Sequence, residues 1–252
     1  MTSIDLNADL GEGMGTDEDL LTIVSSASIA CGGHAGDAPT IRHILKLCKQ
    51  RGVRAGAHPG YADPKRFGRF RLVMPLDELL GQIRSQLFLV RFIADEVGTP
   101  LSYVKLHGAL ANQTAEELAF AVGIFATIQA MDPKMAVLAL DNSEQVRAAK
   151  AVGMPLIREA YADRADTAEG LLVPRNQDGA VIHDVDAVVE RCLRLAQTGE
   201  IVAIDGTVLK SAARSICLHG DTPGAVDLAR EVRDALEGEG IEIAPAPFES
   251  PE

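Results

Sequence analysis

The sequence contains no tryptophan, and aromatic residues make up only 4% of its 252 positions. Basic residues are also scarce: lysine and arginine number 24 against 36 aspartates and glutamates, which gives a formal net charge of −12. Binding to nucleic acid irrespective of sequence needs a basic patch, and single strands usually stack on aromatic side chains. We therefore predict that nucleic acid is not a partner.

Cysteine pairs and long apolar runs are lacking too. The four cysteines have no C-x-x-C spacing and fall in strand-like runs or on apolar helical faces: Cys31, Cys48, Cys192 and Cys217. This pattern predicts buried free thiols in a reducing compartment, in place of disulfides or a zinc cluster. The N-terminus lacks an export signal and no apolar run approaches membrane-spanning length, so we predict a cytoplasmic protein without a membrane partner.

Three common motifs of catalysis and nucleotide binding are missing. The chain has no G-x-S-x-G nucleophile elbow and no G-x-x-x-x-G-K-[ST] phosphate loop, and the glycines at 11, 13 and 15 do not have G-x-G-x-x-G spacing. The chain therefore lacks the usual means of binding ATP alone. A nucleophilic pair of Cys31 and His34 is conceivable, but Cys31 falls inside a predicted strand, where its thiol would be buried.

The stretch from Ser28 to Asp37 is the most informative in the chain. Its apolar run from Ile29 predicts a buried strand that stops at two glycines. An amphipathic helical pattern begins after Pro39, with Asp37 expected as the N-cap. His34 is therefore predicted on a loop between the carboxyl end of a strand and a helix, where chemistry collects in α/β folds.

Strands and helices alternate over the whole length. Strands are predicted at about 3–9, 29–31, 53–57, 101–106, 135–140, 156–160 and 215–218, and helices at about 17–24, 40–51, 75–97, 114–131, 143–152, 185–197 and 225–236. A hairpin is expected at 201–209 and a long irregular segment at 165–182. The alternation predicts a single α/β barrel domain over 1–252, with a loosely held proline-rich tail at 245–252.

Four histidines follow four different predicted strands: His34, His58, His107 and His219. Carboxylates and a lysine occupy similar ends: Asp9, Glu12, Lys105, Glu159 and Asp163. In a closed barrel these positions converge on one mouth. Such a set suits general acid–base chemistry near neutral pH, and an aspartate with two histidines is also a familiar set for a hydrolytic divalent metal. We expect the remaining histidines, His43 and His183, on the surface.

The most basic segment lies between residues 62 and 72. It carries Lys65, Arg66, Arg69 and Arg71 around Phe67. It could bind a carboxylate or a phosphate, or it could be an ordinary solvated loop, and the sequence leaves both interpretations open.

Six ordered motifs give the chain a family resemblance: DLNADLGEG (5–13), IACGGHAGD (29–37), GAHPGY (56–61), YVKLHGAL (103–110), EAYADR (159–164) and SICLHGDTPGAV (215–226). Together they resemble the LamB/YcsF family over nearly the whole chain. The resemblance implies a (β/α)7 TIM-like barrel similar to those of metal-dependent deacetylases and some glycoside hydrolases.

The resemblance also implies an activity, that of the A subunit of an ATP-dependent 5-oxoprolinase. The reaction is 5-oxoproline + ATP + 2 H2O → glutamate + ADP + phosphate, shared with partner subunits B and C. ATP would be a co-substrate together with Mg²⁺. Which subunit binds ATP, whether a divalent metal is bound and whether the chain forms a homo-oligomer stay open.

The chain departs from the family pattern at three positions. Gly33 stands where a phenylalanine is common, Leu106 where a proline is common, and Ala111 where a tyrosine is common. The lost bulk at Gly33 and Ala111 predicts a wider pocket near His34 and His107, which leaves the exact lactam open.

From the resemblance we expect Asp9 or Glu12 to act as general base, and Lys105 and His107 to stabilise the developing oxyanion. The substrate carboxylate would be held by an arginine, for which the candidates are Arg69, Arg164 and Arg175. Further substrate contacts are expected from Asn7, His34, His58, Asp163, His219 and Asp221. By analogy with the deacetylases, a divalent metal could bind Asp9, His34 and His58. Two purely structural interpretations are a pair of Glu159 with Arg164 and a cap of the 165–182 segment by Asp163.

Two other functions compete with lactam hydrolysis coupled to ATP. One is a stand-alone metal-dependent hydrolase or deacetylase acting on another amide or a sugar. The other is a non-catalytic subunit that delivers a lactam to its partners. ATP-independent turnover with stoichiometric metal would favour the first, and tight lactam binding by a subunit whose mutation spares activity would favour the second.

Overall fold

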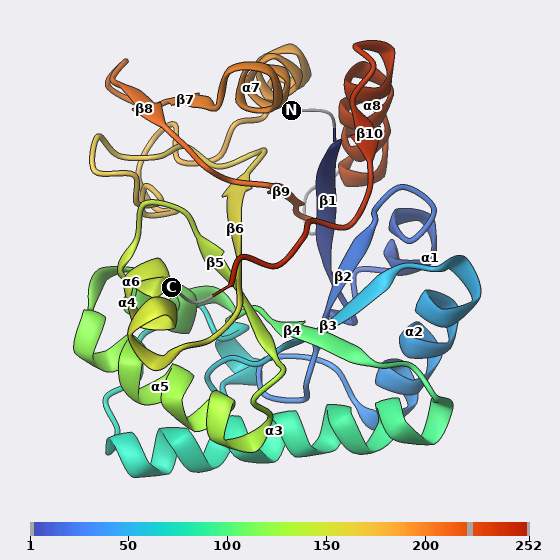
Figure 1. Ribbon diagram of the computed structural model, residues 1–252, viewed down its shortest axis with the longest axis vertical. Coiled ribbons are helices and arrows are strands. Elements are labelled where there is room, and N and C mark those ends of the chain that lie inside the picture. Colours follow the sequence, from blue (N-terminus) through green and yellow to red (C-terminus); the bar gives the residue numbers. More distant parts are fainter. Residues whose placement is uncertain (1–2, 221–223, 251–252) are drawn as a thin grey trace.

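The computed structural model describes residues 3–220 and 224–250 (Figure 1). The strands are β1 (Ser3–Leu10), β2 (Ser26–Ala30), β3 (Arg54–His58), β4 (Leu101–Val104), β5 (Ala136–Leu140), β6 (Leu156–Tyr161), β7 (Glu200–Val202), β8 (Val208–Lys210), β9 (Ser215–Leu218) and β10 (Glu242–Ile243). The helices are α1 (Asp17–Leu20), α2 (Ala38–Arg51), α3 (Leu76–Val97), α4 (Gly108–Glu116), α5 (Leu118–Met131), α6 (Glu144–Val152), α7 (Val185–Thr198) and α8 (Ala225–Gly238), with a 3-10 turn η1 (Pro64–Arg66).

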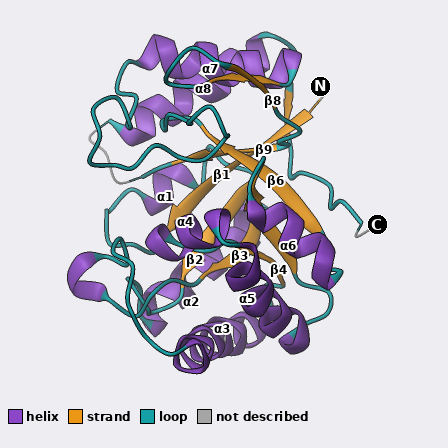
Figure 2. Cartoon of the chain, turned by 90° about the vertical axis from the view of Figure 1, so that its left-hand side faces the viewer, coloured by secondary structure: helices purple, strands orange, loops and turns teal. Residues whose placement is uncertain are grey.

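Seven of these strands form a closed parallel barrel. Their order is β1, β2, β3, β4, β5, β6 and β9, and β9 pairs again with β1. The short β10 adds to β1 in parallel outside the ring. Figure 2 shows the strands enclosed by helices, with α3 and α7 at opposite ends of the molecule. The predicted (β/α)7 barrel is confirmed.

The alternation in β1 sorts its side chains between two environments. Ile4, Leu6 and Ala8 join the apolar layer under the helices, whereas Asp5 and Asn7 are buried on the other face. The carboxylate of Asp5 accepts hydrogen bonds from Ser25, Ser26 and Ser215. Hydroxyl donors of this kind satisfy a buried carboxylate at the amino end of the barrel, away from the mouth.

Two predicted helices differ in the structure. The helix expected at 114–131 is two helices, because Glu117 takes an extended backbone (φ −120°, ψ 96°) between α4 and α5. Helix α4 also starts earlier, at Gly108, directly after His107. The helix expected at 17–24 ends at Leu20, and residues 21–24 continue as turns that lead the chain into β2.

The local signals at helix ends are confirmed. The carboxylate of Asp37 accepts a hydrogen bond from the amide of Thr40 at 2.9 Å, and Gly52 closes α2 in the left-handed region (φ +70°). Ser143 and Asp184 cap α6 and α7 in the same way. Asp37 therefore has a structural role that explains its place in the motif.

The tail is a correction to the sequence prediction, because residues 245–250 are held against the barrel. Leu156 and Glu249 exchange two backbone hydrogen bonds, and Arg54 donates to the carbonyl of Ala246, which is buried. Arg158 also donates to the carboxylate of Glu249. Proline content predicted a loose segment, but these long-range contacts fix it.

The hairpin expected at 201–209 is present as the antiparallel pair β7 and β8. Among the described residues, no helix combines the length and apolar character that crossing a membrane would require. The cytoplasmic location stays a prediction.

Candidate active site

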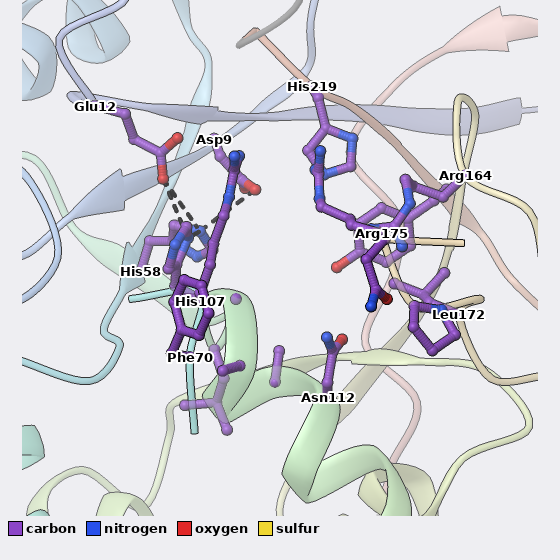
Figure 3. A pocket seen from close by; sticks show the side chains of 18 residues that line it. Asp9, Glu12, His58, Phe70, His107, Asn112, Arg164, Leu172, Arg175 and His219 are labelled. Carbon is purple, nitrogen blue, oxygen red and sulfur yellow. Dashed lines mark hydrogen bonds and ion pairs between the residues drawn. The ribbon is translucent and has the colours of Figure 1, made fainter. Parts of the chain in front are cut away.

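A cavity of about 590 Å³ opens at the carboxyl ends of the barrel strands (Figure 3). Its lining combines ionisable, amide and apolar side chains: Asp9, Glu12, His58, Arg69, Phe70, Leu106, His107, Ala111, Asn112, Tyr161, Arg164, Leu172, Pro174, Arg175, Asn176 and His219. Figure 3 shows Glu12, Asp9 and His58 on one side and Arg164 and Arg175 on the other. One wall is therefore rich in carboxylates and imidazoles, and the opposite wall carries guanidinium groups.

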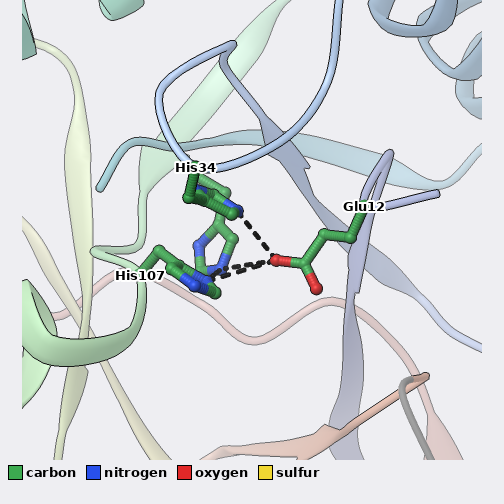
Figure 4. A group of neighbouring side chains, drawn as sticks. Glu12, His34 and His107 are labelled. Atoms are coloured by element: carbon green, nitrogen blue, oxygen red, sulfur yellow. Dashed lines mark hydrogen bonds and ion pairs between the residues drawn. The ribbon is translucent and has the colours of Figure 1, made fainter. Parts of the chain in front are cut away.

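Three imidazoles lie beside one oxygen of the Glu12 carboxylate, and Figure 4 labels two of them, His34 and His107. Its Oε1 lies 2.9 Å from His34 Nε2, 3.2 Å from His107 Nδ1 and 3.7 Å from His58 Nε2. The rings of His34 and His107 stack at 3.5 Å between centroids. The turns after β1, β2, β3 and β4 bring these residues together, as the strand ends predicted.

The outer nitrogens of two of these rings bind the main chain. His58 Nδ1 donates to the carbonyl of Lys105 at 2.8 Å, and His107 Nε2 donates to the carbonyl of Phe67 at 2.9 Å. Phe67 adopts a left-handed backbone (φ +54°), which is unfavourable for a side chain of its size. The strained backbone at Phe67 thus carries the carbonyl that orients the ring of His107.

The charges of the cluster follow from burial and neighbours. Burial lowers the pKa of His34 to about 4 and also lowers the pKa of His107, despite the nearby Glu12. Burial opposes protonation of His58, yet Asp9 and Glu12 outweigh it and raise the pKa of His58. The pKa of Glu12 falls below its usual range, because its imidazole partners outweigh burial. Glu12 is therefore held as the carboxylate.

Lys105 lies inside the barrel beneath the cavity and contacts four groups. Its ammonium is 3.0 Å from Asp9 Oδ1, 3.1 Å from Glu159 Oε2, 3.1 Å from Asn7 Oδ1 and 3.0 Å from Cys217 Sγ. Burial opposes the ammonium form, but the two carboxylates raise the pKa of Lys105 well above its usual value. Burial also works against the anion of Asp9, and His58 and Lys105 together lower the pKa of Asp9.

A second imidazole–carboxylate pair lies across the cavity. His219 Nδ1 is 2.6 Å from Asp163 Oδ1, and the ring of His219 stacks on that of Tyr161 at 5.3 Å between centroids. Burial opposes the anion of Asp163, but His219 outweighs it and lowers the pKa of Asp163. Because Nδ1 is engaged, Nε2 is the ring nitrogen that remains for a substrate atom.

The guanidinium wall is built from three loops. Arg69 follows η1, Arg164 follows β6, and Arg175 belongs to the 165–182 segment. Arg164 donates to the carbonyls of Val173 and Ala180, so it also fixes that segment. Burial lowers the pKa of Arg164, and the charges of Arg175 and Arg69 lower it further. All three arginines line the same cavity.

Both structural interpretations of neighbouring acids need correction. Glu159 pairs with Lys105 and not with Arg164, since Glu159 points into the barrel and Arg164 toward the long segment. The carboxylate of Asp163 binds His219, and its backbone carbonyl accepts a hydrogen bond from the amide of Ile182 in the segment.

Several predicted site residues support the cavity without lining it. Asn7, His34, Lys105 and Asp163 are buried and absent from its wall. Asn7 donates to Glu159 and Ser215, and its role as a substrate contact stays a prediction. Asp221 lies outside the described residues. In the basic loop, Arg66 pairs with Asp63 and Arg71 with Glu116, so only Arg69 and Phe70 reach the cavity.

The predicted widening of the pocket holds at one position and fails at the other. Ala111 lines the cavity, so the missing ring there enlarges it. Gly33 does not line it, because buried Gln86 fills the space: a Cβ at Gly33 would lie 2.3 Å from Gln86 Oε1. Gln86 is fixed there by hydrogen bonds with both the amide and the carbonyl of Gly60.

Replacing Gly33 with alanine is expected to lower the free energy of unfolding by about 1–3 kcal/mol, since the new methyl group overpacks against the fixed Gln86. Urea unfolding measures the loss. Gly81→Ala is the matched control, because a Cβ at that helical position meets nothing within 4 Å and should stabilise α3. Gly33→Ala with Gln86→Ala should cost less than the sum of the single changes, and strict additivity would contradict the contact.

The four cysteines are free and buried, as predicted. Burial raises the pKa of Cys31 to about 12, so a thiolate nucleophile beside His34 is not available near neutral pH. His43 and His183 are exposed, also as predicted.

Two groups of side chains could hold a cation. One is Glu12, His34, His58 and His107, and the other is Asp9, Cys217 and His219; within each group the donor atoms lie within 4.8 Å of one another. Nitrogen and carboxylate donors suit Zn²⁺ or a similar ion. The expected set of Asp9, His34 and His58 is divided between the two groups.

Some residues that line the cavity carry no role in the sequence predictions, among them Asn112 and Tyr161. Glu159 was predicted at the mouth, but its contact with Lys105 was not. Asn112 is missed because α4 is predicted to start at about residue 114, after Asn112. The direction of the Asn112 side chain could therefore not be predicted. The alternation of β6 already places Glu159 and Tyr161 on one face, and that signal was available.

Comparisons with known proteins agree with this geometry. The model of the LamB/YcsF family matches residues 4–250. The chain is 47% identical over 246 residues to the 5-oxoprolinase A subunit of Streptomyces avermitilis, covering 96% of this chain and 98% of that protein. It is 43% identical over 249 residues to the 5-oxoprolinase A subunit of Nitrobacter hamburgensis, covering 96% and 98%.

Two solved structures are also similar to this chain, to different degrees. The lactam utilization protein from Thermus thermophilus has a TM-score of 0.89 at 34% identity, covering 96% of this chain and 99% of that one. A family 4 carbohydrate esterase from Streptomyces lividans has a TM-score of 0.51 at 10% identity, covering 97% and 93%. The second likeness shows a shared fold alone.

Proposed function

Because the chain belongs to the LamB/YcsF family, we propose that it is the lactam-hydrolysing subunit of an ATP-dependent 5-oxoprolinase. The relatives that are named as 5-oxoprolinase A subunits match it over nearly their whole length. The observation that carries the proposal is the cavity itself, in which a carboxylate–imidazole wall faces a wall of arginines. The first can activate water, and the second can hold a carboxylate.

Binding comes first in the proposed reaction. Arg69, Arg164 and Arg175 supply charge for the carboxylate of 5-oxoproline, which a guanidinium group binds through two parallel hydrogen bonds. The lactam ring then extends toward Asp9 and Glu12 on the opposite wall. Water between the walls would lose its proton to one of these two carboxylates as it attacks the lactam carbon.

The leaving nitrogen needs a proton when the ring opens. His219 is placed for this role, because Asp163 fixes its ring from behind and the ring faces the cavity. A carboxylate in this position orients the imidazole. Lys105 cannot reach the cavity directly, so its part would be to hold Asp9 in place as the anion.

ATP would make the lactam reactive. An amide is stabilised by resonance, and transfer of the terminal phosphoryl group of ATP to its oxygen, with release of ADP, would leave a carbon that water attacks readily. Breakage of the C–N bond would then leave an acyl phosphate and a protonated amine, and a second water would release phosphate to give glutamate. The chain lacks a phosphate-loop motif, so we propose that ATP and Mg²⁺ are handled together with partner subunits B and C.

His219→Gln should lower kcat for glutamate release by about 10²–10⁴-fold, the range typical of a lost general acid. The melting temperature should change little, since His219 lies at the cavity edge. His43→Gln removes an exposed histidine that also pairs with a carboxylate, and it should leave kcat unchanged. An unaltered kcat in His219→Gln would remove this residue from the proton transfer.

Glutamate release from 5-oxoproline tests the function as a whole. The chain is assayed with verified subunits B and C, with and without ATP. Release that needs ATP and all three proteins supports the proposal. Absence of release with folded partners would refute 5-oxoproline as the substrate, and lactams that fit the space beside Ala111 would be assayed next.

A second candidate is a stand-alone metal-dependent amide hydrolase. The Glu12 cluster favours it, because three imidazoles and a carboxylate are a familiar donor set for a hydrolytic metal. When bound, such an ion would polarise a carbonyl and acidify water. Turnover of an amide by this chain alone, without ATP, would decide for it.

A further inference from the structure

The Glu12 cluster contains two ring nitrogens that lie within hydrogen-bond distance of each other, His58 Nε2 and His107 Nδ1. A carbonyl oxygen only accepts, so the hydrogen bonds to Lys105 and Phe67 fix protons on His58 Nδ1 and His107 Nε2. In neutral rings the other nitrogens, His58 Nε2 and His107 Nδ1, are then acceptors. They lie 3.0 Å apart, with the Glu12 carboxylate beside both and Asp9 Oδ2 3.3 Å from His58 Nε2. Acceptors this close repel one another unless a metal ion lies among them or His58 carries a second proton, the form that Asp9 and Glu12 favour.

The spacing of the three acceptors matches a metal ion. Their separations are 3.0 Å between the two nitrogens, and 3.2 Å and 3.7 Å from Glu12 Oε1 to His107 and His58. Ligands of Zn²⁺ at about 2.0–2.1 Å in tetrahedral geometry are roughly 3.3 Å apart. A backbone carbonyl on the outer nitrogen is also the usual support of a metal-binding histidine.

His34 differs from the other members of the cluster. His58, His107 and Glu12 line the cavity, but His34 does not. It stacks behind His107, and its Nε2 contacts Glu12 while its buried Nδ1 has no hydrogen-bond partner. Its position suits a residue that orients Glu12 from behind.

The surrounding turns are shaped to the rings. A Cβ at Gly60 would lie 3.0 Å from His107 Cβ and 3.1 Å from His34 Nδ1, and one at Gly68 would lie 2.9 Å from His34 Cβ. With the strained Phe67 between them, this loop leaves the imidazoles little freedom. A rigid set of donors is what a metal site needs before the ion arrives.

We propose that His58 Nε2, His107 Nδ1 and a carboxylate oxygen of Glu12 bind one divalent transition-metal ion such as Zn²⁺, with the cavity side open and His34 as a positioning residue. Three protein ligands and an open side are the arrangement of catalytic zinc sites. The ligand set differs from the one expected by analogy with the deacetylases, because it takes Glu12 and His107 in place of Asp9 and His34. Asp9 is then the carboxylate that remains for water.

Metal binding by the purified chain alone tests this site without ATP, lactam or partners, so the outcome does not depend on the proposed function. The chain is stripped with a chelator and titrated with Zn²⁺ against a chromogenic chelator, and Co²⁺ absorption provides a second readout. We expect one equivalent per chain. Glu12→Gln and His107→Gln should each weaken binding by more than about 100-fold, and His34→Gln by about 10–100-fold, as for a supporting residue.

His219→Gln is the matched control, because it removes a cavity-lining histidine of the other donor group. It should keep full stoichiometry. Loss of binding in His219→Gln but not in His107→Gln would move the site to Asp9, Cys217 and His219 and overturn the proposal. Absence of stoichiometric Zn²⁺ and Co²⁺ binding by the unmodified chain would also overturn it, in favour of a second proton on His58. This last outcome is measured on the unmodified chain, so it does not depend on whether any variant folds.

Discussion

Glutamate release by the complete complex is expected to fall by about three orders of magnitude when Glu12 is replaced by glutamine, in the range typical of losing an essential acid–base group. The amide has the same shape but no charge, and Glu12 Oε1 is the atom on which His34 and His107 converge. The loss should appear in kcat, measured as glutamate formed per chain. The fold should persist, because the substitution preserves volume and Glu12 sits at the cavity wall.

Glu18→Gln provides the matched control. Glu18 also pairs with a histidine, His43, at 3.1 Å, but both side chains are exposed and neither lines the cavity. This variant should retain the activity of the unmodified chain. If Glu12→Gln kept full activity at an unchanged melting temperature, Glu12 would be neither a base nor a metal ligand needed for turnover.

Lys105→Met is expected to lower the free energy of unfolding by about 3–5 kcal/mol, because it leaves two buried carboxylates without their cation. Asp9 and Glu159 lie 3.0 Å and 3.1 Å from the ammonium group, whose side chain is only 2% exposed. Chemical unfolding of the purified chain measures the change. Lys210→Met removes an exposed ion pair with Glu200 and should change stability little.

The cost of Lys105→Met should also depend on pH. Burial raises the pKa of Glu159, and Lys105 acts against this rise. Without the lysine the pKa of Glu159 rises further, and a carboxyl group whose pKa is raised by folding destabilises the fold as the pH increases through that value. The destabilisation should therefore be larger at pH 8 than at pH 5. Combining Lys105→Met with Glu159→Gln should recover part of the loss, and an equal loss at both pH values would contradict the explanation.

The sequence predicts the barrel well because its signals are local. Strand and helix periods alternate, and cap residues such as Asp37 and Ser143 mark the helix starts. The convergence of His34, His58 and His107 then follows from the closed topology, in which every carboxyl end of a strand faces one mouth. The break at Glu117 was not predictable in this way, since it is a change of backbone angle within a continuous apolar pattern.

What the sequence does not predict is the direction of each side chain at the mouth. Lys105 and His107 follow the same strand, yet Lys105 points beneath the cavity and His107 lines it. The difference depends on acceptors from distant parts of the chain, including Asn7 and the carbonyl of Phe67. Such contacts exist only after folding. The residue type at a strand end therefore predicts that a residue belongs to the site better than it predicts what the residue does there.

The contact between Gly33 and Gln86 restricts which pairs of residues positions 33 and 86 can hold in related proteins. The space that Gln86 occupies is the space a side chain at position 33 would need, so the two positions cannot vary independently. A relative with a bulky residue at position 33 must carry a small residue, or a differently directed one, at position 86. A chimaera could take the loop between β2 and α2 from such a relative and α3 from this chain. The bulky side chain at position 33 would then clash with Gln86, so the chimaera should fold poorly, although each parent folds well.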